Sequence, residues 1–264
     1  MSQKNREGKR SARERLQEQR EKDRARDKRK RTMAAVGAVV VVLGVATGVG
    51  LFASKAKEDS GKSGGAVEAP RGAVGKGRLV IETGRDAKPG RPTPSTLTVY
   101  EDFRCPGCKQ FEDAFRTTLH QLQDSGRLKV QYHLVTIIDG NMGGIGSLHA
   151  ANAAGCAQDA GKFRAYHDVL YQHQPDETRD TYADKKRLIK LAGKVPALDT
   201  PAFRACVKDG RHDGWVKKSS ETFNRSGFAS TPTVLLNGKS VYGDPNKPLS
   251  PDKLKRMVAA EGRG

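Results

Sequence analysis

Two cysteines at close spacing offer the clearest chemistry in this sequence of 264 residues, in the segment Cys105-Pro106-Gly107-Cys108. Two thiols so placed either bind a metal ion or form a disulfide that opens and closes. The chain has two further cysteines, Cys156 and Cys206, which lie far downstream and far from each other. Because the ligands of a four-thiolate zinc site usually come as two close pairs, we expect redox chemistry and no metal site.

The elements predicted around the cysteine pair also favour redox chemistry. Residues 96–100 alternate as in a strand, and Phe111 and Phe115 begin a helical repeat just after the pair. The pair would therefore begin a helix, where unpaired backbone N–H groups and the helix dipole lower the pKa of a thiol. We expect Cys105 to be the exposed nucleophile, with a lowered pKa, and Cys108 to be the resolving thiol one turn inside.

Five neighbouring residues are candidates for tuning the pair. Pro106 fixes φ at the start of the helix without losing a hydrogen bond. Gly107 brings no side chain, so no histidine adds positive charge beside the thiolate, whereas Arg104 is a candidate source of such charge. Glu101 or Asp102, if buried, could carry the proton of the second thiol. The alternative for these two carboxylates is a solvated strand end or a helix cap.

The remaining periodicity predicts an α/β fold interrupted by helices. Three further strands are predicted at residues 79–81, 128–134 and 233–236, and Asn237-Gly238 is a strong hairpin turn before a returning strand at 239–242. Several helices are predicted within an insertion at about 147–225. Ser250-Pro251 opens the last helix. The predicted order is β-β-α-β, a helical block, then β-β-α.

Two separated motifs resemble one protein family. The segment Tyr100–Cys108 resembles the active-site segment of DsbA-like members of the thioredoxin superfamily, and Thr231-Pro232 before a strand resembles their cis-proline loop. The resemblance covers about residues 78–262. It implies a thioredoxin fold with a helical insertion, dithiol–disulfide exchange at Cys105 and Cys108, and no cofactor. It also implies that Thr231 pairs with substrate through its backbone; the alternative for Pro232 is an ordinary trans turn.

The resemblance leaves the direction of the redox reaction open. Common oxidants of this family carry Pro-His between the cysteines, whereas this chain carries Pro106-Gly107, and isomerase-type relatives also have threonine before the cis-proline. The leading hypothesis is an enzyme that forms disulfides in exported proteins and is recycled by a membrane redox partner. The alternatives are a reductase or isomerase for exported thiols, as in cytochrome or copper-site assembly, or a non-catalytic tethered binding module.

The other two cysteines, Cys156 and Cys206, are expected to form a structural disulfide. An oxidising compartment favours a disulfide over free thiols, and some DsbA-like proteins carry a second bridge in this region. The alternative is a pair of buried free thiols that pack as small apolar side chains.

The N-terminal part predicts a membrane anchor. Residues 1–32 contain 14 Lys/Arg against 6 Asp/Glu and read as a disordered cytoplasmic tail. Residues 33–53 carry no charge and suffice to cross a bilayer as one transmembrane helix, which the positive-inside rule orients with the domain outside the cytoplasm. A cleaved signal peptide is the alternative. Residues 54–77 would be a flexible linker and 78–264 the catalytic domain. With a net charge of +18 and no nucleic-acid module, lipid is the expected partner of the tail.

Overall fold

The computed structural model describes residues 67–86 and 95–261. The basic tail (1–32), the predicted transmembrane helix (33–53) and most of the predicted linker lie outside these residues. Within the described ranges, no helix combines the length and the apolar character needed to cross a membrane.

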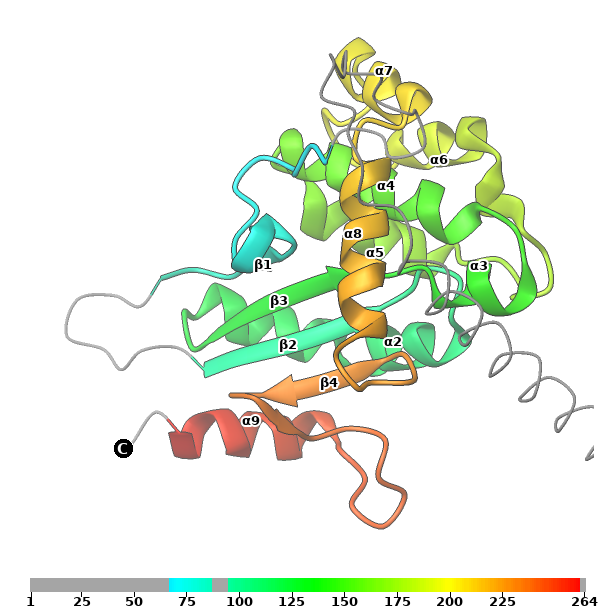
Figure 1. The fold of residues 1–264 in the computed structure, drawn as a ribbon. Coiled ribbons are helices and arrows are strands. Elements are labelled where there is room, and N and C mark those ends of the chain that lie inside the picture. Colours follow the sequence, from blue (N-terminus) through cyan, green and yellow to red (C-terminus); the bar gives the residue numbers. More distant parts are fainter. Residues whose placement is uncertain (1–66, 87–94, 262–264) are drawn as a thin grey trace, which may run out of the picture. The chain divides into compact units, whose positions relative to one another are not determined.

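Alternating apolar side chains build a central sheet with the strand order β1-β3-β2-β4-β5 (Figure 1). The central strands β2 and β3 are parallel, whereas β1, β4 and β5 each run antiparallel to their neighbour. Alternate residues of β2, including Leu97, Val99 and Glu101, are buried on one face of the sheet. The strands span Ile81–Thr83 (β1), Ser95–Glu101 (β2), Leu128–Leu134 (β3), Thr233–Leu236 (β4) and Lys239–Ser240 (β5).

Helices cover the sheet on both faces. Helix α2 (Pro106–Asp124) contacts β3 and also α9 (Pro251–Glu261), whereas α8 (Asp213–Asn224) crosses in front of the sheet in the view of Figure 1. Tyr100, on the face of β2 opposite to Val99, stacks on His133 and lies 5.5 Å from Phe223 of α8, measured between ring centroids. The described part of the chain therefore has the three-layer arrangement expected for an α/β core.

The helical insertion runs from α3 to α8, between β3 and β4. It comprises α3 (Ile137–Met142), α4 (Gly146–Asp159), α5 (Phe163–Gln172), α6 (Lys185–Ala192), α7 (Pro201–Asp209) and α8. Helix α4 contacts α5, α7 and α8 and is the buried centre of this block. Its Ala-rich sequence explains this position, because small side chains let several helices approach closely. The predicted insertion is confirmed, although α3 was not predicted from its Gly- and Asn-containing sequence.

Two predicted boundaries need correction. Residues 67–77, expected to belong to the linker, pack into the domain: Ala73 is buried and Val74 forms a bridge with Val80. Arg71 N also donates to Asp159 Oδ1. The returning strand after the Asn237 turn ends at Ser240 instead of continuing to residue 242, because Tyr242 turns away to pack on Phe111.

Candidate active site

The cysteine pair lies at the junction of β2 and α2. Strand β2 ends at Glu101, and Cys105 is the N-terminal cap residue of α2, with Pro106 in the first turn. Cys105 is 6% exposed and Cys108 is 1% exposed. The prediction that Cys105 is exposed at the helix tip is therefore corrected, whereas the deeper burial of Cys108 agrees with the prediction.

The loop before β4 covers Cys105. The Thr231–Pro232 peptide bond is cis, as the sequence resemblance implies, and the Cys105 Sγ donates a hydrogen bond to the Thr231 carbonyl oxygen at 3.2 Å. A Cβ on Gly107 would lie 3.3 Å from Pro232 Cδ and 3.7 Å from Cys105 Sγ. The glycine thus lets the proline loop approach the cysteine pair closely. The sequence analysis considered only that Gly107 adds no charge, and it did not predict this packing role.

The Cys105 thiol has a lowered pKa, as predicted. A hydrogen bond from Cys108 is the largest cause, and further donors are the side chain of Thr231 and the backbone N–H groups of Cys108 and Gly107. Burial raises the pKa, but the hydrogen bonds outweigh it, and the pKa falls from 9.0 to about 6. The helix start therefore stabilises a thiolate at Cys105 near neutral pH.

The Cys108 thiol has a pKa raised well above its ordinary value. Burial is the largest cause, followed by the hydrogen bond to Cys105 and the negative charges of Cys105 and Glu101. The two thiols of the pair therefore differ in protonation at neutral pH: Cys105 is the thiolate and Cys108 keeps its proton.

Asp102 is buried, and its carboxylate accepts hydrogen bonds from backbone N–H groups. Its Oδ1 accepts from the Arg104 N–H at 2.8 Å, and its Oδ2 accepts from the Ile138 N–H at 2.9 Å. Burial raises the pKa of this carboxyl to about 7 even though these hydrogen bonds lower it. Asp102 thereby ties the loop before the cysteine pair to the start of α3.

Arg104 extends away from the thiol pair into the insertion. Its Nη1 lies 2.7 Å from Asp139 Oδ1 and 3.1 Å from Asp180 Oδ1, and it donates to the Gly143 carbonyl. Only 3% of the Arg104 side chain is exposed. Its charge is thus paired with two carboxylates, which does not fit the expectation that it supplies positive charge to the Cys105 thiolate.

Glu101 belongs to a buried group of two acids and one histidine. The sequence analysis identified Glu101 as a candidate but neither Glu112 nor His167. Glu101 Oε1 lies 2.8 Å from His167 Nε2, and Glu112 is equally buried. One atom from each of these three residues lies within 4.8 Å of the others. Helical spacing could have found Glu112, because it lies one turn after Cys108 on the buried face of α2. His167 gives a weaker indication, as a polar residue within the apolar stripe of α5.

Gln174 is a second residue that sequence reasoning missed. Its Nε2 donates to the carbonyl oxygens of Phe103 at 2.9 Å and Cys105 at 3.0 Å. These two bonds tie the segment that follows α5 to the loop that presents the nucleophile. No sequence motif marks this residue, because the contact joins segments that are distant along the chain.

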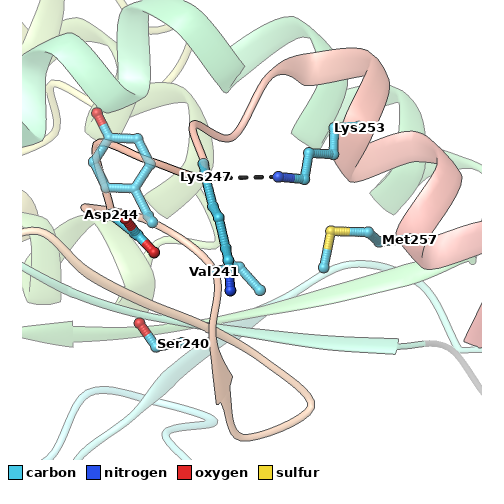
Figure 2. A pocket seen from close by; sticks show the side chains of 7 residues that line it. Ser240, Val241, Asp244, Lys247, Lys253 and Met257 are labelled. Atoms are coloured by element: carbon cyan, nitrogen blue, oxygen red, sulfur yellow. Dashed lines mark hydrogen bonds between the residues drawn. The ribbon is translucent and has the colours of Figure 1, made fainter.

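A small cavity lies next to Tyr242. It measures about 200 Å³ and is lined by Val241, Tyr242, Met257 and neighbouring residues between β5 and α9 (Figure 2). Tyr242 packs against Phe111 of α2 with ring centroids 5.1 Å apart. Tyr242 thus connects the wall of this cavity with the helix that carries the cysteine pair.

The predicted structural disulfide is present. Cys156 of α4 is bonded to Cys206 of α7, with an S–S distance of 2.04 Å. Both residues are 2% exposed. The bridge joins two helices of the insertion and involves neither thiol of the pair at 105 and 108, which are free.

Known proteins resemble this chain in sequence and in fold. The structure resembles that of reduced DsbA from Mycobacterium tuberculosis with a TM-score of 0.59 and 27% identity, covering 70% of this chain and 93% of that one. Disulfide bond formation protein D of Bacillus subtilis is 24% identical over 69% of this chain and 85% of its own length. Na(+)/H(+) antiporter NhaA 3 of Salinispora tropica is 31% identical over 63% of this chain.

The match to the antiporter is partial, since this chain spans 24% of that protein's length. A family model described as Thioredoxin matches residues 90–260, which is more than half of the chain. That range contains the cysteine pair, the cis-proline loop and the whole helical insertion. The chain belongs to the thioredoxin family, with DsbA-like proteins among its structural neighbours.

Proposed function

We propose that the protein is a thiol–disulfide oxidoreductase that forms disulfides in exported polypeptides. The observation that carries this proposal is the asymmetry of the dithiol. Cys105 has a pKa of about 6 beneath the cis-proline loop, and Cys108 is buried with a raised pKa. A nucleophile that is ionised at neutral pH beside a protonated resolving thiol suits dithiol–disulfide exchange.

The exchange follows from the geometry. A substrate thiolate attacks Cys105 Sγ of the oxidised pair; the bond between Cys105 and Cys108 breaks, and Cys108 takes up a proton. A second substrate thiolate attacks the mixed disulfide, which forms the substrate disulfide and releases Cys105 as a thiolate. The thiolate is a good leaving group because of its low pKa. The edge of the Thr231–Pro232 loop is the candidate surface on which extended substrate backbone pairs beside Cys105.

The lowered pKa of Cys105 favours the oxidising direction. Hydrogen bonds that stabilise the thiolate stabilise the reduced protein, and this raises the reduction potential of the pair. The reductase or isomerase that was the alternative would use the same residues at a lower potential. Recycling to the disulfide requires an external oxidant, for which a membrane redox partner is the candidate.

A redox titration against glutathione tests the proposal. A potential nearer to about −120 mV than to about −270 mV supports the oxidant, and the reverse result supports a reductant. The companion assay is oxidation of a reduced, unfolded model protein by the oxidised enzyme. Cys105→Ser should abolish that oxidation, whereas Cys156→Ala/Cys206→Ala should retain it. A Cys105→Ser variant with full activity would instead support a non-catalytic binding module.

We also propose that residues 33–53 anchor the domain outside the cytoplasm. The support is the uncharged segment itself and the basic run that precedes it. Alkaline carbonate extraction of the full chain tests the anchor: an anchored protein stays with the membranes. Protease added to intact spheroplasts should then digest the catalytic domain and spare the N-terminal tail.

A further inference from the structure

A second feature of the site is a set of buried titratable groups that includes Glu112, one turn after Cys108 in α2. Glu101 at the end of β2, Glu112 of α2 and His167 of α5 are each 1% exposed. Among the described residues, Glu101 Oε2 and Glu112 Oε1 are buried without a hydrogen-bond partner. An unpaired buried carboxylate oxygen lowers stability, so its presence calls for a functional reason.

The set continues outward from His167 to the protein surface. His167 Nε2 lies 2.8 Å from Glu101 Oε1, and its Nδ1 lies 3.8 Å from Asp168 Oδ1. Asp168 Oδ2 in turn lies 3.3 Å from His120 Nε2. Side-chain exposure rises from 2% at His167 to 15% at Asp168 and 30% at His120. Titratable groups thus form a continuous line from the buried carboxylates to solvent.

The charges around His167 suit a proton carrier. Burial alone would lower the pKa of His167, but Glu101, Glu112 and Asp168 together raise it well above its ordinary value. Burial raises the pKa of Glu112 to about 8, against the lowering effect of His167. The titratable and charged groups that face His167 or its partners come from β2, β3, α2 and α5: Glu101, Tyr132, Glu112, Arg116, His120, Asp168 and Tyr171.

Cys108 needs such a carrier. It must gain a proton each time its disulfide opens and lose one each time the disulfide forms, yet only 1% of the residue is exposed. Asp102 is poorly suited to this task, because both its oxygens already accept backbone N–H groups. Glu101 keeps one oxygen free, and its charge contributes to the raised pKa of Cys108.

We propose that His167 is a positioning residue that passes the proton of Cys108 between Glu101 and the surface pair Asp168–His120. When substrate opens the disulfide, the electron pair goes to Cys108 Sγ, which takes up a proton that His167 delivers from Nε2 through the Glu101 carboxylate. His167 regains a proton at Nδ1 from the Asp168 side. The same transfers run backwards when the disulfide forms again. This inference rests on the proposed exchange function.

The two-step reaction of the reduced protein with Ellman's reagent tests the relay. Cys105 attacks the reagent first, and Cys108 then displaces the second thionitrobenzoate, so each thiol gives its own phase in stopped flow at 412 nm. His167→Asn should leave the first phase unchanged and slow the second at pH 6 by about tenfold or more, as expected for loss of general acid–base catalysis. The slowed phase should accelerate as pH rises, because hydroxide replaces the relay.

A matched histidine provides the control. His212 is 1% exposed, and its Nε2 lies 2.9 Å from Asp159 Oδ2, so His212→Asn removes a similar buried pair away from the dithiol. It should leave both phases and their pH dependence unchanged. Asp168→Asn, at the partly exposed end, should slow the second phase in the same pH-dependent way. It keeps the test valid if His167→Asn does not fold.

The outcomes separate the relay from the function. A second phase with the wild-type rate and pH dependence in both His167→Asn and Asp168→Asn would overturn the relay and leave exchange intact. An equal slowing in His212→Asn would also overturn it. Absence of both phases in the wild-type protein would instead refute the proposed exchange function.

Discussion

At the scale of single residues, the surroundings of the two thiols shift their pKa values in opposite directions. Cys105 meets hydrogen-bond donors at the start of α2, whereas Cys108 meets the apolar interior and the charge of Glu101. Because the folded pKa of Cys105 lies below its unfolded value, the thiolate stabilises the reduced protein at high pH. This contribution is complete above about pH 9 and is lost as pH falls through about 6.

We expect the thiolate absorbance at 240 nm of the reduced protein to titrate with a midpoint near 6. Thr231→Val should raise that midpoint by about one unit, since a hydrogen bond to a charged group is worth about 1.5 kcal/mol. Thr233→Val, whose hydroxyl donates to the Ser230 carbonyl instead, is the matched control and should not move it. A midpoint of about 8.5 in the wild type would contradict an activated thiolate.

At the scale of elements, Arg104 connects the active-site loop to the insertion. Its guanidinium joins Asp139 of α3, Asp180 and the backbone of Gly143, and its own N–H is held by Asp102. The nucleophile follows directly in sequence. The position of Cys105 is therefore coupled to helices that were inserted between β3 and β4.

Arg104→Ala should lower the free energy of unfolding by about 3 kcal/mol, because it leaves partly buried carboxylates without their cation. Urea denaturation of the oxidised protein measures this change. Arg204→Ala is the control: its pair with Asp199 is exposed, so little change is expected. Equal effects of the two substitutions would argue against a structural role for Arg104.

The disulfide between α4 and α7 stabilises the insertion independently of the redox pair. Cys156→Ala/Cys206→Ala should lower the free energy of unfolding by about 4 kcal/mol, since the bridge closes a loop with a sequence separation of 50. Urea unfolding gives the value. The exchange rate of the Cys105 pair, measured at a temperature where the variant is folded, should be unchanged. A changed rate would show that the insertion transmits strain to the site.

At the scale of the whole molecule, the folded domain begins earlier than its strands suggest. His212 Nδ1 lies 2.8 Å from the Glu68 carbonyl oxygen, and Trp215 Nε1 donates to the Arg78 carbonyl at 2.8 Å. The segment that precedes β1 thus satisfies buried polar groups of α8 and of the turn before it. Residues 67–77 belong to the domain that carries the site.

A chain that starts at residue 67 should therefore be more stable than one that starts at residue 78. We expect a difference of about 3 kcal/mol, because the shorter chain exposes the site of Ala73 and leaves His212 without its backbone partner. Thermal and urea unfolding of the two chains, both oxidised, measure it. Equal stability would show that the segment only rests on the domain surface.

Much of the fold was accessible from the sequence because local periodicity encodes it. The alternation in β2 and β3, the apolar repeat of α2 and the Asn237-Gly238 turn each depend on residues close together in the chain. Helix α3 was not predicted, and β5 was predicted to be longer than it is. Both elements depend on tertiary contacts. Asp102, for example, stabilises the start of α3 through the Ile138 N–H.

The sequence by itself indicated the redox pair and its place at a helix start, because a short motif and local periodicity mark them. The cis-proline loop was implied by the resemblance to DsbA-like proteins, and the second disulfide was favoured by that resemblance and an oxidising compartment. The structure decided both against a trans turn and free thiols. Only the tertiary structure decided that Glu101 pairs with the buried His167, where the charge of Arg104 is paired, and that Gln174 reaches the loop of the nucleophile. These residues act across long sequence separations, where burial and distance, rather than spacing along the chain, decide the chemistry.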